Sequence, residues 1–191
     1  MLTRIVKVGG SLLTWPPLAD ALRTWLARQP PALNVLLPGG GTLVDVIRRA
    51  DRDLSLGDEA AHWRCVDLLS VTARWLTAKL GDVPLLETHD ELLFCRNARQ
   101  RARVVFDVRE WLQRHEPSGA GRRLPHDWSV TSDSIAARLA EVIGADELVI
   151  LKSADPPAES VAKLAIAGYI DRHFPPAAAA LAVVRFVNLR G

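Results

Sequence analysis

Apolar runs in this chain repeatedly lead into a short polar or glycine-rich loop and then into a segment with helical periodicity. Three such runs lie at residues 4–8, 33–37 and 128–130, and they lead into loops at residues 9–11, 39–41 and 131–134. Strands that alternate with helices pair in parallel, because each helix returns the chain to the same end of the sheet. We therefore expect an α/β fold, a three-layer αβα sandwich with a mostly parallel central sheet. In such a fold these loops gather at the carboxyl ends of the strands, where ligands bind.

The rest of the chain predicts further elements of both kinds. Helices are expected after Pro16-Pro17, after Thr42 as a capping residue, from Ser55 or Asp58 through Leu80, and between residues 135 and 143. Short strands are expected at residues 83–87, 92–95, 103–106, 148–151 and 181–187. The stretch 117–123 is rich in Gly, Ser and Arg and predicts a mobile loop. In the helix after Thr42, helical spacing places Leu43, Val46 and Ile47 on the inner face.

The two glycine-rich loops have the composition of a phosphate site. They read Lys7-Val8-Gly9-Gly10-Ser11 and Gly39-Gly40-Gly41-Thr42. Glycine lets backbone N–H groups approach phosphate oxygens, and the following helix adds its unpaired N-terminal donors. Neither loop matches the GxxxxGK[ST] or GxGxxG motif, so a P-loop enzyme and a Rossmann dehydrogenase both lose support. Two loops of this kind can hold two phosphates.

The lysines add a second signal. The chain has 20 Arg but only four Lys, at positions 7, 79, 152 and 163. Lys7 and Lys152 both lie where an apolar strand meets a loop. A flexible ammonium group at such a junction can follow a moving phosphoryl group, although lysines also favour exposed strand ends.

Composition limits the possible partners. With 191 residues, 49% of them hydrophobic, the chain can bury a substantial core, and we expect one domain over residues 1–191. The formal net charge is +2 and only residues 96–103 concentrate arginine, so nucleic-acid binding is not expected. No signal-like start and no apolar run of about 20 residues are present, which predicts a cytoplasmic protein with no membrane contact. Cys65 and Cys95 lack a CxxC partner and are expected to pack without chemistry.

The loops, taken in order, resemble those of the amino acid kinase superfamily, which includes acetylglutamate, uridylate and isopentenyl phosphate kinases. Lys7-Val8-Gly9-Gly10-Ser11 is similar to the K-x-G-G-S motif of the superfamily, and Gly39-Gly40-Gly41 to its acceptor-side glycine loop. Ser132-Asp133-Ser134 with Ala136 is similar to its D-S-x-A segment, and residues 145–155 resemble a uridylate kinase segment. The resemblance spans about residues 4–155 and implies an amino acid kinase-like domain.

A closer resemblance is to the aminomethylfuran phosphate kinase-like subgroup of methanofuran biosynthesis. It is carried by Pro38-Gly39-Gly40-Gly41, Asp45-Val46-Ile47-Arg48, Asp51-Arg52 and Asp58-Glu59-Ala60-Ala61-His62-Trp63. This resemblance implies an ATP-dependent kinase that transfers the γ-phosphoryl group to a phosphomonoester, aminomethylfuran phosphate, in the supply of a one-carbon cofactor.

The resemblance also assigns roles to residues. Lys7 and Lys152 would contact the transferring and leaving phosphates, and Asp133 would orient the two lysines. The remaining residues divide between the two substrates. The nucleotide side would comprise Lys7, Gly9, Gly10, Ser11, Lys152 and Asp155, and the acceptor side Gly39, Gly40, Gly41, Thr42, Asp45 and His62. No protein ligand to a metal is predicted, because Mg²⁺ would arrive with ATP and be held mainly by phosphates and water.

Several alternatives remain open. Asp133, Ser11 and Thr42 have the residue types of helix caps, and His62 and Asp45 suit a packed histidine and a polar helix face. The enzyme alternative is a carboxylate kinase of the acetylglutamate kinase type. The other is a nucleotide- or oxyanion-binding relative without turnover. Tryptophans at 63 and 75 on one helix predict a homo-oligomer.

Overall fold

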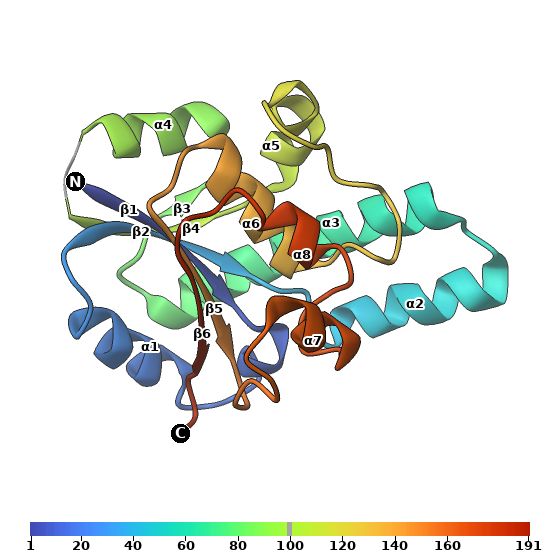
Figure 1. Cartoon of the computed structure of the whole chain (residues 1–191), viewed down its shortest axis with the longest axis horizontal. Helices are drawn as coiled ribbons and strands as arrows, with labels where there is room; N and C mark the ends of the chain where they lie inside the picture. Colours follow the sequence, from blue (N-terminus) through green and yellow to red (C-terminus); the bar gives the residue numbers. More distant parts are fainter. Residues whose placement is uncertain (99–100) are drawn as a thin grey trace.

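The computed structural model describes residues 1–98 and 101–191, which form an α/β fold (Figure 1). The strands are β1 (Leu2–Val8), β2 (Ala32–Pro38), β3 (Leu85–Leu86), β4 (Ala102–Phe106), β5 (Glu147–Lys152) and β6 (Val184–Asn188). The helices are α1 (Leu18–Ala27), α2 (Leu43–Leu54), α3 (Asp58–Leu80), α4 (His89–Asn97), α5 (Arg109–Arg114), α6 (Ser132–Val142), α7 (Val161–Ile166) and α8 (Phe174–Ala177). Two short 3-10 helices occupy Gly10–Leu12 and Glu116–Ser118.

All six strands form one parallel sheet in the order β3-β4-β2-β1-β5-β6. The central strand β1 pairs with β2 on one side and with β5 on the other, so that Lys7 lies beside Leu37 and Ile150. The carboxyl ends of β1, β2 and β5 therefore lie next to one another. This arrangement confirms the predicted αβα sandwich, and the sheet is parallel throughout its described strands.

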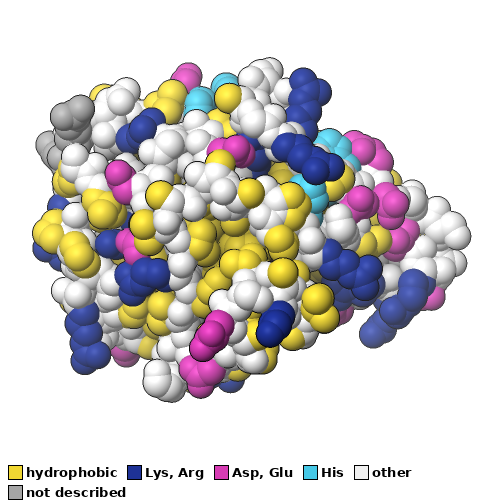
Figure 2. Space-filling view, in the orientation of Figure 1, with side chains coloured by type: hydrophobic (Ala, Val, Ile, Leu, Met, Phe, Trp, Pro, Cys, Tyr) yellow, Lys and Arg dark blue, Asp and Glu magenta, His cyan; other side chains and the backbone are white. Residues whose placement is uncertain are grey.

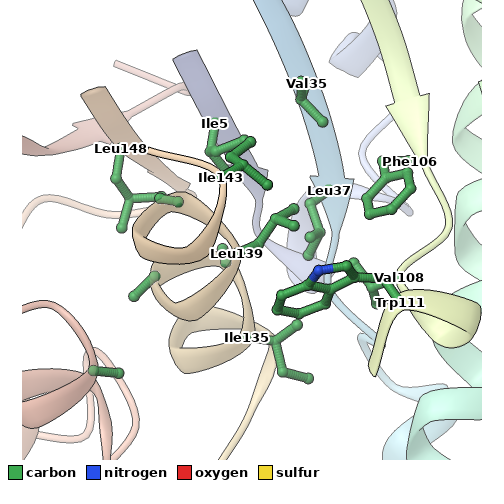
Figure 3. Packing of buried hydrophobic residues seen from close by; sticks show 14 of the residues in the cluster. Ile5, Val35, Leu37, Phe106, Val108, Trp111, Ile135, Leu139, Ile143 and Leu148 are labelled. Carbon is green, nitrogen blue, oxygen red and sulfur yellow. The ribbon is translucent and has the colours of Figure 1, made fainter. Parts of the chain in front are cut away.

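The layers follow from side chains that alternate across the strands. Along β1, Ile5 belongs to one buried cluster and Val6 to the other. Helix α6 packs on the first face, where Ile135, Leu139 and Ile143 meet the sheet and the fully buried Trp111 of α5 (Figure 3). Helix α1 and the carboxyl half of α3 cover the opposite face. Burial of each such side chain stabilises the fold by roughly 1.5–3 kcal/mol.

Several predicted elements differ from the structure. Residues 92–95 lie inside α4, where Thr88 and Glu91 form a capping box that starts a helix. Residues 128–130 form a turn instead of a strand. Val46 faces outward and is 65% exposed, because α2 extends away from the sheet (Figure 1). The terminal strand is confirmed as β6.

The loop predicted at residues 117–123 is tied to the body of the molecule. Arg138 of α6 is fully buried and donates hydrogen bonds to the carboxylate of Glu116 and the carbonyl groups of Gly119 and Ala120. Of the arginine-rich segment 96–103, residues 99 and 100 lie outside the described residues. No helix among the described residues is long and apolar enough to cross a membrane.

Candidate active site

A cavity of about 410 Å³ lies at the carboxyl ends of β1, β2 and β5. The two glycine loops, the amino end of α6 and residues from α2 and α3 line it. Three strands end here because their apolar residues stop at Val8, Pro38 and Leu151, and the chain turns into polar loops. The sequence prediction that these loops gather at one edge of the sheet is confirmed.

Three charged side chains form the floor of the cavity. The Nζ atom of Lys7 lies 2.7 Å from Oδ1 of Asp133, and Nζ of Lys152 donates a hydrogen bond of 2.8 Å to Oδ2. The Asp133 and Lys7 side chains are 4% and 5% exposed, and that of Lys152 is 16% exposed. We refer to these residues as the charge triad. It contains two cations and one anion, so it leaves one positive charge beside the cavity.

The pKa values of the triad follow from burial and charge together. Burial raises the pKa of Asp133, but the ammonium groups of Lys7 and Lys152 outweigh this effect and hold the pKa below its usual range. Burial and the charge of Lys7 lower the pKa of Lys152, while Asp133 opposes that change. Asp133 is therefore ionised at neutral pH and unsuited to act as a base.

The two glycine loops touch each other through their backbones. A Cβ atom on Gly10 would lie 2.2 Å from the backbone nitrogen of Gly41, so no side chain fits at this contact. Gly41 also has a φ of +59°, in the left-handed region that favours glycine. The sequence motif is thus explained by a close approach that sets the distance between the two loops.

The backbone donors of these loops divide into two groups. Gly9 donates its N–H to the carbonyl of Leu151, and Gly39 donates to that of Val8, so both groups are used within the sheet. The N–H groups of Gly10, Gly40 and Gly41 have no backbone acceptor among residues 1–98 and 101–191. These three groups are consequently the donors that an anion in the cavity can use.

The capping alternatives for three predicted residues can be compared with the structure. Thr131 is the N-cap of α6, and Asp133 lies inside the helix with its carboxylate directed to the lysines. Thr42 precedes α2 without a capping hydrogen bond from its side chain. The Oγ of Ser11 lies 2.9 Å from that of Ser153, which joins the loops after β1 and β5. Thr42 and Ser11 both line the cavity.

The far wall of the cavity comes from α2, α3 and the turn before α6. Asp45 pairs with Arg48, whose guanidinium lies 5.2 Å from the centre of the Trp128 ring. The indole of Trp128 in turn donates a hydrogen bond of 2.7 Å to Asp51. This wall presents an aromatic face, one arginine and the carboxylates of Asp45 and Asp127 to the cavity.

His62 is buried in the same wall. Its ring stacks on His126 with 4.6 Å between centroids, and its Nε2 has no hydrogen-bond partner among the described residues. Burial, followed by the nearby His126, lowers the pKa of His62 to about 4. The imidazole is therefore neutral at pH 7, and His62 is one of the residues that line the cavity.

Two predicted nucleotide residues lie away from the cavity. Gly9 packs under Leu151 and Lys152, where a Cβ atom would lie 2.8 Å from the Leu151 carbonyl oxygen. Asp155 lies in the exposed loop after β5. The other predicted residues on both sides line the cavity, and these are Lys7, Gly10, Ser11, Lys152, Gly39, Gly40, Gly41, Thr42, Asp45 and His62 together with Asp133.

Sequence reasoning missed several residues near this site. Arg48 and Trp128 line the cavity, and Asp171 accepts hydrogen bonds at the amino end of α6. Trp128 follows the predicted mobile stretch, and Asp171 lies 38 positions after Asp133, so neither had a motif to mark it. Arg48 was part of the motif that resembles the kinase subgroup, but it was given no role of its own. Figure 2 shows Lys and Arg side chains gathered over the α2 side of this face, next to histidines.

The fold and the cavity define an α/β protein with a cationic cavity at the carboxyl edge of a parallel sheet. No protein-family model matches the chain. It is 23% identical over 155 residues to the (5-(aminomethyl)furan-3-yl)methyl phosphate kinase of Methanocaldococcus jannaschii, and 30% identical over 159 residues to the uridylate kinase of Haloquadratum walsbyi. Each match covers 79% of this chain, which spans 66% and 58% of these relatives.

Solved structures show the same fold. The UMP kinase of Bacillus anthracis superimposes with a TM-score of 0.64 at 12% identity, covering 99% of this chain and 88% of that one. The uridylate kinase of Archaeoglobus fulgidus gives a TM-score of 0.53 at 19% identity, covering 84% of this chain and 70% of that one. The chain therefore shares the fold of these UMP and uridylate kinases.

Proposed function

We propose that this chain transfers the γ-phosphoryl group of ATP to a phosphomonoester, with aminomethylfuran phosphate as the first candidate acceptor. The observation that supports this most directly is the charge triad, in which Lys7 and Lys152 share Asp133 beside two glycine loops. The relatives named above are kinases of phosphorylated acceptors.

The residues of the cavity suit phosphoryl transfer because this reaction depends on positioning and charge neutralisation. The ammonium groups of Lys7 and Lys152 would neutralise charge on the transferring and leaving phosphates. The free N–H groups of Gly10, Gly40 and Gly41 would bind phosphate oxygens where a side chain would collide. Asp133 would keep both lysines charged and directed.

Magnesium would come with ATP. The described residues contain no group of three or more His, Cys, Asp or Glu side chains that could hold a metal ion. A Mg²⁺ ion that arrives with ATP would be held mainly by phosphates and water, and it would neutralise charge on the phosphates.

The far wall supports the choice of acceptor. A phosphate acceptor is already anionic and needs no base, which agrees with the lowered pKa values of Asp133 and His62, both too low for an effective base. The carboxylates of Asp45 and Asp127 face the same cavity and suit an amine on the acceptor. Hydrogen bonds from Ser129 hold the pKa of Asp127 below its usual range, so it is ionised. UMP is the second candidate acceptor, because the uridylate kinase relative is the more identical of the two.

The test is ADP release from Mg-ATP with each of four acceptors, namely aminomethylfuran phosphate, UMP, isopentenyl phosphate and acetylglutamate. We expect release with aminomethylfuran phosphate, loss of release in Lys7→Ala, and normal release in the control Lys79→Ala, which changes a lysine on α3 outside the cavity lining. Release with acetylglutamate alone would instead indicate a carboxylate kinase. ATP binding without any release would indicate a binding protein and contradict the proposal.

We also propose that the protein forms a homo-oligomer through α3. Val71 and Trp75 on this helix are 49% and 50% exposed, which leaves large apolar side chains in solvent. Sedimentation of the wild type and of Trp75→Arg would test this, and a wild-type monomer would contradict it.

A further inference from the structure

We propose that Asp171 is a positioning residue that holds the charge triad in its working geometry. The proposal rests on the function proposed above, because it assigns Asp171 a part in the same reaction. Asp171 does not line the cavity, and it acts through α6.

The Asp171 carboxylate binds the amino end of α6 through four hydrogen bonds. Its Oδ2 accepts from the backbone N–H of Thr131 at 2.9 Å, from the hydroxyl of Thr131 at 2.7 Å and from the N–H of Ser134 at 3.0 Å. Its Oδ1 accepts from the hydroxyl of Ser134. These donors flank Asp133 on both sides in the sequence, so the carboxylate clamps the turn that carries the central anion of the triad.

The same short segment also contacts Lys152. The Nζ of Lys152 lies 5.4 Å from the centre of the Tyr169 ring, and the Tyr169 hydroxyl donates to the carbonyl of Ala154 at 3.0 Å. Between Tyr169 and Asp171, Ile170 is only 3% exposed and anchors the segment in the core. One segment of the chain therefore touches both the strand end that carries Lys152 and the helix end that carries Asp133.

This arrangement has a physical purpose beyond stability. Two ammonium groups repel each other, and Asp133 can hold both only if each of its oxygens faces one lysine. A carboxylate at a helix amino end satisfies its free N–H groups and favours one orientation of the first turn. Without Asp171 the first turn of α6 would lose four bonds, and the direction of the Asp133 side chain would no longer be set.

The first experiment compares Asp171→Asn with Glu91→Gln. Glu91 accepts the N–H groups of Glu87 and Thr88 at the start of α4, so it is a matched carboxylate at a helix start away from the cavity. We expect Asp171→Asn to lower kcat by about 10- to 100-fold with little change in the KM for ATP. Asp171→Glu should recover part of the loss, and Glu91→Gln should keep wild-type kcat.

The second readout does not require turnover. The protein has only four lysines, so selective ¹³Cε-lysine labelling yields four side-chain NMR signals. We expect Asp171→Asn to shift the signals of Lys7 and Lys152 and to leave those of Lys79 and Lys163 in place. Ser134→Ala keeps every charge and removes one bond to Asp171, and it should shift the same two signals by a smaller amount.

The outcomes separate the two proposals. Unchanged Lys7 and Lys152 signals in both variants would overturn the positioning role, even if kcat falls. Should Asp171→Asn fail to fold, Ser134→Ala decides the question by the same criterion. If the wild type releases no ADP with any acceptor, the proposed function fails, while the lysine signals still decide whether Asp171 positions the triad.

Discussion

Strands β1 and β5 contribute to a cluster of two cations and one buried carboxylate at each of their ends. At the carboxyl end, Lys7 and Lys152 share Asp133. At the amino end, Arg4 and Arg185 share Glu147, with Arg185 on Oε1 at 2.7 Å and Arg4 on Oε2. The two clusters have the same net charge, and each takes one residue from β1 and one from β5, with the third from α6 at the carboxyl end and from β6 at the amino end.

The clusters differ in how their donors are used. Arg4 also donates to the side chain of Asn34 at 2.8 Å, and Arg185 donates to Gln29 at 3.2 Å. Lysine carries three donors, and Lys7 and Lys152 each place one of these on Asp133 and face the cavity. Charge alone therefore does not mark a functional site. Unused donors next to a cavity distinguish the carboxyl-end cluster, for which a function is proposed, from the amino-end cluster.

Lys7→Ala tests whether the carboxyl-end cluster acts in catalysis, and it should cause a large loss of activity. Because the role proposed for Lys7 is to neutralise charge on the transferring phosphate, we expect kcat for ADP release to fall by about 1,000-fold or more. Steady-state ADP assays at saturating ATP measure this. If Lys7→Ala retains more than a tenth of wild-type kcat, the carboxyl-end cluster is structural like its counterpart.

The second effect concerns stability at the amino end. Arg4 is 1% exposed, so Arg4→Ala would leave Glu147 buried with one partner fewer. We expect the free energy of unfolding to fall by about 3–5 kcal/mol. Urea denaturation measures it, with Arg103→Ala as a control at an exposed ion pair, where about 0–1 kcal/mol is expected. A loss below 1 kcal/mol in Arg4→Ala would contradict the structural role.

The stability of the protein should depend on pH through His62, which lies in the cavity wall. His62 has a pKa lowered from 6.5 to about 4, so below pH 6.5 the unfolded chain takes up a proton that the folded protein does not. Its contribution therefore makes the protein less stable as the pH falls from 6.5 to 4, by up to about 3 kcal/mol in total. In the cluster at the amino ends of β1 and β5, the pKa of Glu147 lies below its ordinary value of 4.5. Denaturation of wild type and His62→Asn at pH 7 and pH 4.5 tests this, and equal pH dependence in both proteins would refute it.

The smallest effect separates ligand contact from helix capping. Thr42 makes no capping bond with its side chain, whereas Thr88 caps α4 through the N–H of Glu91. Thr88→Ala should cost about 1 kcal/mol of stability, and Thr42→Ala should change it by less than about 0.5 kcal/mol. Thermal unfolding measures both. A decrease in kcat/KM in Thr42→Ala without a loss of stability would support an acceptor contact.

Much of the fold and part of the site follow from local sequence. The strand, loop and helix order predicts the parallel sheet, because the apolar runs at β1, β2 and β5 are short and end at polar loops. Lys7 and Lys152 lie close together because they occupy equivalent places at the carboxyl ends of two neighbouring parallel strands. Short motifs predict these features because a few neighbouring residues determine where each strand ends and its loop begins.

Other features depend on a local capping signal that sequence reasoning missed, or on contacts between distant residues. The segment 92–95 is apolar enough for a strand, and the capping box at Thr88 and Glu91 decides for a helix. Asp171 reaches the start of α6 across 37 to 40 positions, and no local pattern connects the two. Val46 was expected inside, but α2 has no core to pack against along most of its length.

None of the twelve residues of α2 is buried, although Thr42, Val44, Asp45 and Arg48 from this region line the cavity. Elements with few buried contacts open locally at a lower free energy than the whole molecule unfolds. The wall of the cavity on this side is thus softer than the floor, which strands β1 and β5 hold rigid. Local opening of α2 would therefore loosen this wall of the cavity before it disturbs the strand ends that carry Lys7 and Lys152.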